Sequence, residues 1–169
     1  MSPFVQRHHR GGSPRLDNHD YSGNFTYYIT ICTKAKIPYF GRIVSDNVCF
    51  SSIGIIADNF WKSIPEHFSF VKLDEYIIMP DHIHGILIFN KPNLPVDTPN
   101  IGASASSNWK PGSLATIINS YKRICTITIK NQGFDFAWQN RYYDHIVKSK
   151  TELDRIRKYI RDNPINYNP

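Results

Sequence analysis

Residues 75–89 read EYIIMPDHIHGILIF, in which apolar runs rich in isoleucine and aromatic residues flank a break at Pro80. This pattern predicts two short strands joined by a turn. Residues two apart in a strand point to the same face of a sheet, with Cα atoms roughly 6.5–7 Å apart. We therefore expect His82 and His84 to leave one face of a sheet while Ile83 enters the core on the other.

Two neutral imidazoles on one rigid element form an incomplete metal site. A catalytic metal needs such open positions, because a substrate oxygen must occupy them. The same pair also occurs in strands that bind no metal, so the pair alone leaves metal binding open. The other histidines are scattered and show no ligand spacing: His8, His9, His19, His67 and His145.

Apolar periodicity and turn residues divide the rest of the chain into further elements. In chain order these are a strand over 24–33, a turn over 34–41, a helix over 51–64 ended by Pro65, strands over 68–79 and 82–89, a helix over 113–130, a strand within 138–147, and a helix from about 150 that stops before Pro164. Ser113 is expected to cap the second helix, and Ser149 or Thr151 the last. This order predicts an α+β ferredoxin-like sandwich, with a central antiparallel sheet and helices packed mainly on one face.

Length and composition indicate a folded protein with one main domain. The 169 residues are 41% hydrophobic and 14% aromatic, which is typical of a globular chain and excludes a disordered one. We expect a basic N-terminal arm over residues 1–20, a single domain over 21–169, and a long polar loop over 90–111 within it. No apolar run approaches the roughly 20 residues that span a bilayer, so we expect no membrane partner.

The net charge of +6 favours an anionic partner, and nucleic acid in preference to a membrane surface. Three cysteines without close spacing argue against a disulfide framework and a zinc ribbon, and fit a reducing cytoplasm. Six cations are the candidates for contact with a nucleic-acid backbone: Lys122, Arg123, Arg141, Lys148, Arg155 and Lys158. Four aromatic residues could stack on bases or pack in the core: Trp109, Trp138, Tyr142 and Tyr143.

The last predicted helix carries RIRKYIRDNP over residues 155–164. Tyr159 and Asn163 are four apart, so we expect them on one helical face. The cations around Tyr159 predict an electropositive setting that attracts a phosphodiester: Arg155, Arg157, Lys158 and Arg161. The amide oxygen of Asn163 could serve as a third, hard ligand of a metal ion.

Three segments together resemble the REP-associated tyrosine transposases, relatives of the single-tyrosine insertion-sequence transposases in the HUH endonuclease superfamily. They are MPDHIHG at 79–85, WQNRYYDHIV at 138–147 and RIRKYIRDNP at 155–164, and YSGNFTYYITICT at 21–33 is similar to the first strand of that family. The resemblance covers about residues 15–168. It implies a fold of the HUH endonuclease type, a DNA substrate and a divalent cation.

The resemblance also implies roles for individual residues. His82 and His84 match the metal-binding histidines, Tyr159 matches the nucleophile, and Asn163 matches a polar residue that completes the metal site. Asp81 stands where many relatives have asparagine, so its role stays open. The implied enzyme uses Mg²⁺ or Mn²⁺ to cut single-stranded or hairpin DNA through a 5′-phosphotyrosyl intermediate and then transfers the strand.

Several alternatives remain open from the sequence. The chain could bind hairpin DNA without cutting it, or be another HUH nickase. A replication initiator commonly has a lysine near its nucleophile and a relaxase usually has its tyrosine ahead of the histidines, whereas here a single tyrosine follows them and Asn163 stands in place of a lysine. A ferredoxin-like domain with a fortuitous histidine pair is the last alternative. A homodimer and a location at the bacterial nucleoid are both compatible with the implied function.

Overall fold

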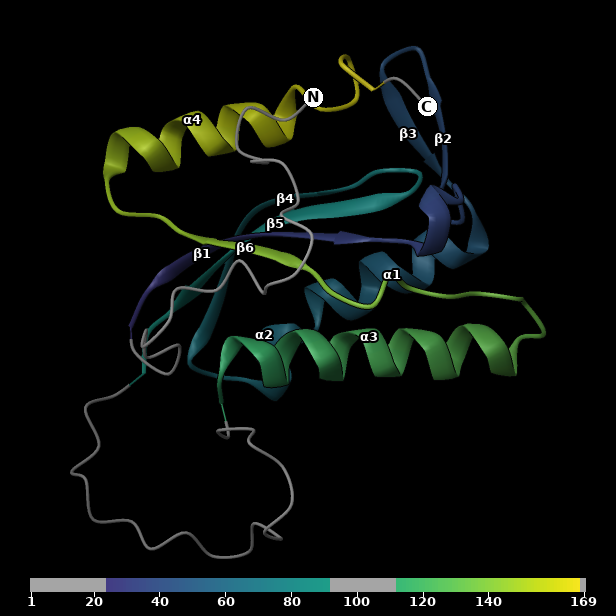
Figure 1. The fold of residues 1–169 in the computed structure, drawn as a ribbon, viewed down its shortest axis with the longest axis horizontal. Helices are drawn as coiled ribbons and strands as arrows, with labels where there is room; N and C mark the ends of the chain where they lie inside the picture. Colours follow the sequence, from purple (N-terminus) through teal and green to yellow (C-terminus); the bar gives the residue numbers. More distant parts are fainter. Residues whose placement is uncertain (1–23, 92–111, 168–169) are drawn as a thin grey trace, which may run out of the picture.

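The computed structural model describes residues 24–91 and 112–167, and Figure 1 shows how their helices and strands are arranged. The predicted N-terminal arm, most of the predicted polar loop and Trp109 lie outside the described residues. None of the helices in the described part of the chain has the length and hydropathy that a membrane crossing requires.

The centre of the molecule is a four-stranded antiparallel sheet in the order β4-β5-β1-β6. Its strands are β1 (Thr26–Cys32), β4 (Val71–Ile78), β5 (His82–Phe89) and β6 (Tyr143–Ile146). Because the two strands that are adjacent in sequence, β4 and β5, pair at one side while β1 and β6 pair at the other, this is the ferredoxin-like arrangement. The α+β class predicted from the sequence is confirmed.

Helices cover both faces of this sheet (Figure 1), three on one and one on the other. α1 (Ser52–Lys62), α2 (Ile64–His67) and α3 (Leu114–Asn131) enclose the larger core, while α4 (Lys150–Arg161) seals a smaller one. Alternation along the strands supplies both cores, so Ile83 is fully buried in the larger core and Ile86 in the smaller.

Serine hydroxyls cap the three longer helices, because each accepts a hydrogen bond from the backbone N–H three residues on. Ser113 caps α3 as predicted. Of the two candidates for α4, Ser149 is the cap and Thr151 lies inside the helix.

The structure differs from the sequence prediction in two places, one an omission and one an error. A hairpin of β2 (Gly41–Val44) and β3 (Asn47–Phe50) was missed, because each strand is short and pairs only with the other. Its turn holds Ser45 and Asp46 at φ 48° and 61°, the left-handed pair that tight hairpins use. The sequence predicted one helix over 51–64 that ends at Pro65, but the structure has two helices there. α1 ends at Lys62, and Pro65 lies in the first turn of α2, where its missing N–H breaks no helical hydrogen bond.

Candidate functional site

The two histidines of β5 lie on the face that α4 covers. Their ring centroids are 4.6 Å apart with the planes at 70°, and His84 is 3% exposed. Ile83 between them belongs to the larger core on the opposite face. The strand alternation predicted from the sequence is therefore present, and it brings the two imidazoles together.

Strand β1 fixes the ring of His84. Its Nδ1 lies 2.9 Å from the hydroxyl of Tyr28 and 2.9 Å from that of Thr30, which is the residue that pairs with His84 in the sheet. Since both contacts engage Nδ1, Nε2 is the nitrogen suited to a metal ion. Burial, followed by the charge of His82 and of Lys36, lowers the pKa of His84 well below 6.5. The ring is therefore neutral near pH 7, as a metal ligand must be.

Asp81 fixes the ring of His82. The sequence left the role of Asp81 open, and this contact gives it one. The Asp81 carboxylate lies 2.5 Å from Nδ1 of His82, and Lys36 approaches the same carboxylate to 3.4 Å. Burial would raise the pKa of Asp81, but the hydrogen bond and charge of His82, together with Lys36, outweigh it and leave that pKa lowered. A carboxylate behind a histidine sets the ring's tautomer and orientation, as in many metal sites.

Helix α4 brings the phenol of Tyr159 to the histidine pair. The ring centroids of Tyr159 and His84 are 5.3 Å apart, and the tyrosine is half-buried. Asn163, in contrast, is not on α4. The helix ends at Arg161, and Asn163 lies in the turn that follows, 7% exposed, with its backbone N–H bonded to the carbonyl of Ile160. Its role as a third ligand stays a prediction.

Tyr167 is a second phenol at the site, and the sequence analysis missed it. Its ring centroid lies 6.3 Å from that of His82. Burial first, and then the charge and hydrogen bond of Asp81, raise the pKa of Tyr167. No local pattern marks this residue, because it follows α4 in irregular structure and meets Asp81 only through the fold.

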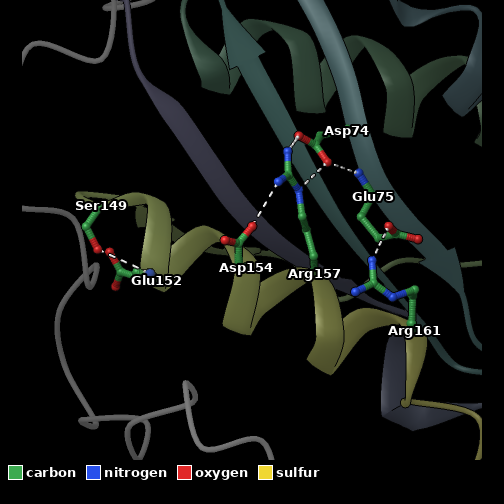
Figure 2. Close-up of polar contacts among 7 residues, drawn as sticks. All are labelled: Asp74, Glu75, Ser149, Glu152, Asp154, Arg157 and Arg161. Carbon is green, nitrogen blue, oxygen red and sulfur yellow. Dashed lines mark hydrogen bonds and ion pairs between the residues drawn. The ribbon is translucent and has the colours of Figure 1, made fainter.

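The electropositive setting predicted for Tyr159 is largely neutralised, which corrects the expectation. Arg157 and Arg161 both bind carboxylates of β4, as Figure 2 shows. Lys158 pairs with Asp162 on its own helix. The sequence did not show these ion pairs, because the carboxylates of β4 that bind the two arginines lie more than 80 residues away in the chain.

The other predicted DNA contacts divide between two layers. Lys148, Arg155 and Lys158 are exposed on or beside α4, and Arg141 is exposed shortly before β6. Lys122 and Arg123 belong to α3, which packs on the opposite face of the sheet from the histidines. The Lys122 ammonium group donates to the carbonyl of Gln139.

The described aromatic candidates pack against the cores. Trp138 lies edge-on to Phe136 at 4.9 Å and donates its indole N–H to the carbonyl of Lys122. Tyr142 packs against the larger core and Tyr143 against the smaller one. Core packing, which the sequence left as the alternative to base stacking, is what these three residues show.

The side chains at this site can supply some of the ligands that a metal ion needs. In residues 24–91 and 112–167, no three His, Cys, Asp or Glu side chains gather closely enough to hold a metal ion. His82 and His84 can therefore supply two nitrogens, each through Nε2 because Nδ1 is engaged. Among the described residues, a further ligand would be of another kind, such as an amide oxygen, and a substrate oxygen could also fill a position.

The fold resembles that of solved structures. A solved structure of a REP-associated tyrosine transposase bound to a REP hairpin covers 90% of this chain and 74% of its own, with a TM-score of 0.59 at 11% sequence identity. A candidate transposase from Deinococcus radiodurans covers 88% of this chain and 97% of its own, with a TM-score of 0.49 at 13% identity. The first likeness shows that this chain and that transposase share a fold.

The particular family is defined by sequence. No protein-family model matches the chain. A Haemophilus influenzae protein that carries only the name "uncharacterized protein" is 32% identical over 169 residues, which span 94% of this chain and 89% of that protein. The chain belongs to the same family as this Haemophilus influenzae protein.

Proposed function

We propose that the chain is a metal-dependent endonuclease and strand transferase of the tyrosine-transposase type that acts on single-stranded or hairpin DNA. One observation carries the proposal. The phenol of Tyr159 lies beside His84, 5.3 Å between ring centroids, at a histidine pair whose Nδ1 atoms are both engaged by protein oxygens. A tyrosine next to an incomplete metal site is an arrangement suited to phosphodiester cleavage through a covalent intermediate.

Tyr159 is the proposed nucleophile. Its phenolic oxygen bonds to the scissile phosphorus, and the bond from phosphorus to the 3′ oxygen breaks. The phenol loses its proton and the departing 3′ oxygen gains one, which leaves a 5′-phosphotyrosyl linkage and a free 3′-hydroxyl. The covalent linkage conserves the energy of the broken bond for a later strand-joining step.

His82 and His84 are the proposed metal ligands, with Asn163 as the third. A bound Mg²⁺ or Mn²⁺ would polarise a non-bridging oxygen of the phosphate. The residues of this chain supply the orientation: Tyr28 and Thr30 hold one ring through Nδ1, and Asp81 holds the other.

Hairpin DNA is the proposed substrate class. The transposase that shares the fold is bound to a REP hairpin. The chain carries a net charge of +6, and Lys148 and Arg155 are exposed at the start of α4, which covers the face of the histidines. In-line approach of a tyrosine to one phosphate is also easier in unpaired DNA that flanks a hairpin than within a stacked duplex.

The test is formation of a covalent adduct. The full chain is incubated with Mn²⁺ and end-labelled single-stranded DNAs that carry the hairpins of its own genome, and adducts are resolved on denaturing gels and identified by mass spectrometry. Wild type and Tyr39→Phe are expected to form the adduct, because Tyr39 packs against the larger core, on the face of the sheet opposite the histidines. Tyr159→Phe, His82→Ala and His84→Ala are expected to lose it. Failure of wild type on every hairpin, or an adduct that persists in Tyr159→Phe, refutes the proposal.

A second candidate is a protein that binds hairpin DNA without cutting it. The absence of a third His, Cys, Asp or Glu ligand among the described residues favours it. It predicts hairpin binding by wild type that is independent of Mn²⁺, unchanged in Tyr159→Phe, and accompanied by no adduct.

A further inference from the structure

An irregularity in β4 turns two consecutive carboxylates toward α4. Between Leu73 and Tyr76, β4 advances by three residues while the paired residues of β5 advance by two, from Leu87 to Gly85. This extra residue is a β-bulge. In a regular strand, neighbours in sequence point to opposite faces. Here both side chains of the bulge, Asp74 and Glu75, reach the helix that carries Tyr159 (Figure 2).

The contact of Asp74 is bidentate. Nε of Arg157 donates to one oxygen of Asp74 at 2.9 Å, and Nη2 donates to the other at 2.5 Å. The Asp74 side chain is 14% exposed. The hydrogen bond from Arg157, opposed by burial, lowers the pKa of Asp74. Two parallel bonds from a planar guanidinium fix geometry as well as charge.

A second ion pair lies one helical turn further along. Nη1 of Arg161 donates to Glu75 at 2.8 Å, from a position four residues after Arg157. Two attachments one turn apart restrict both rotation of α4 about its axis and sliding along it. Tyr159 lies between the two arginines in the sequence, so the same attachments restrict its phenol.

The apolar contact between α4 and the sheet is small, so the two ion pairs matter for the position of the helix. Its fully buried members from the helix are Ile156 and Ile160, which meet Tyr28 and Ile86 of the sheet. The larger core on the other face is built from many more side chains. Apolar burial is also non-directional, and it does not by itself fix the rotation of a helix.

We propose that Asp74 is a positioning residue: through Arg157 it holds α4 in the register that keeps the Tyr159 phenol beside His84, with Glu75 and Arg161 as a second attachment. The consequence for catalysis rests on the proposed function. The positioning itself is a property of the free protein and can be measured without DNA or metal.

The experiment compares Asp74→Asn with the matched control Asp154→Asn. Asp154 is the other carboxylate on Arg157, but it lies on α4 itself and cannot tie the helix to the sheet. In the metal-free full chain, the nuclear Overhauser effect between the ring protons of Tyr159 and His84 reports their proximity. We expect this signal in wild type and Asp154→Asn, and at least a fivefold loss in Asp74→Asn. An unchanged signal in Asp74→Asn, or an equal loss in both variants, overturns the proposal.

A second variant covers the case in which Asp74→Asn does not fold. Arg157→Lys keeps the charge but loses the bidentate geometry, and the same loss of signal is expected in a chain whose melting temperature stays close to that of wild type. An unchanged signal in Arg157→Lys also overturns the proposal.

Adduct formation then separates this proposal from the proposed function. Where wild type forms the adduct, Asp74→Asn is expected to form it at least tenfold more slowly with DNA affinity unchanged or tighter, because a misplaced nucleophile slows the chemistry while a released guanidinium can bind phosphate. If wild type forms no adduct yet Asp74→Asn loses the ring–ring signal, the positioning stands and the proposed function fails. If wild type and Asp74→Asn form the adduct equally fast with equal signals, the positioning fails and the proposed function stands.

Discussion

Replacing Gly85 by alanine tests why a glycine directly follows the histidine pair. Gly85 points to the larger core, where a Cβ atom would lie 2.3 Å from Cζ2 and 3.0 Å from Cη2 of Trp61. Trp61 has no exposed surface and is enclosed by Tyr76 and Tyr121, so it cannot move aside without displacing other rings. Overpacking of a filled core costs about 1–3 kcal/mol. We expect Gly85→Ala to lose this much, with a fall in melting temperature of about 2–4 °C per kcal/mol.

The assay is urea unfolding of four chains: wild type, Gly85→Ala, Trp61→Phe and the double variant. The indole N–H of Trp61 has no partner among the described residues, so its replacement by phenylalanine removes no hydrogen bond there. The shorter ring makes room for the methyl group, and the double variant should therefore be more stable than the sum of the single changes predicts, by at least about 1 kcal/mol. A neutral Gly85→Ala, or strictly additive effects, would show that the contact with Trp61 does not explain the glycine.

The other predictions concern charge at the site. Asp81→Asn should weaken binding of Mn²⁺ to the DNA-free chain by about 10–100-fold in calorimetry, because the carboxylate orients His82; a change of less than twofold would contradict this role. The pKa of His84 is lowered in the folded chain, so below pH 6.5 this imidazole binds a proton in the unfolded chain but stays neutral in the folded one. The free energy of unfolding should therefore fall below pH 6.5 by up to about 1.4 kcal/mol per pH unit. Urea unfolding at pH 7, 6 and 5 should show this slope in wild type and a shallower one in His84→Gln. The lowered pKa of Asp74 acts in a more acidic range: its contribution is present above pH 3.8 and is lost as pH falls from 3.8 through the folded value, so the stability difference between wild type and Asp74→Asn should shrink there, and a constant difference would contradict the ion pair.

The parts of the fold that follow from local pattern were predictable. The bounds predicted for the strand over 82–89 are those of β5, and Ser113 caps α3 as predicted. Strand period alone placed His82 and His84 on one face, because two-residue alternation holds wherever a strand is regular. Where the strand is irregular the same rule fails: alternation would send Asp74 and Glu75 to opposite faces, and the bulge sends both to α4.

What could not be predicted depends on contacts between distant parts of the chain. The cations around Tyr159 suggested a positive surface, yet Arg157 meets a carboxylate that lies 83 residues earlier. Tyr167 reaches Asp81 only after the last turn folds back over β5. Neither contact leaves a periodic signal, since each depends on how α4 and its following turn sit on the sheet.

The side chains of the site come from the sheet and from α4, and this division determines which of them a substitution elsewhere can displace. His84 and its two hydroxyl partners belong to β5 and β1, where the register that pairs Thr30 with His84 also fixes the imidazole; a slip by one residue would place Ile29 or Ile31 opposite the ring and turn their side chains to this face. The imidazole of His84 is thus held by the two central strands of the sheet. Tyr159 comes from a helix seated on two buried isoleucines and two ion pairs. Substitutions that leave the fold intact can therefore shift the phenol more readily than the imidazole of His84, so the proposed activity should respond most sensitively to the contacts between α4 and the bulge of β4.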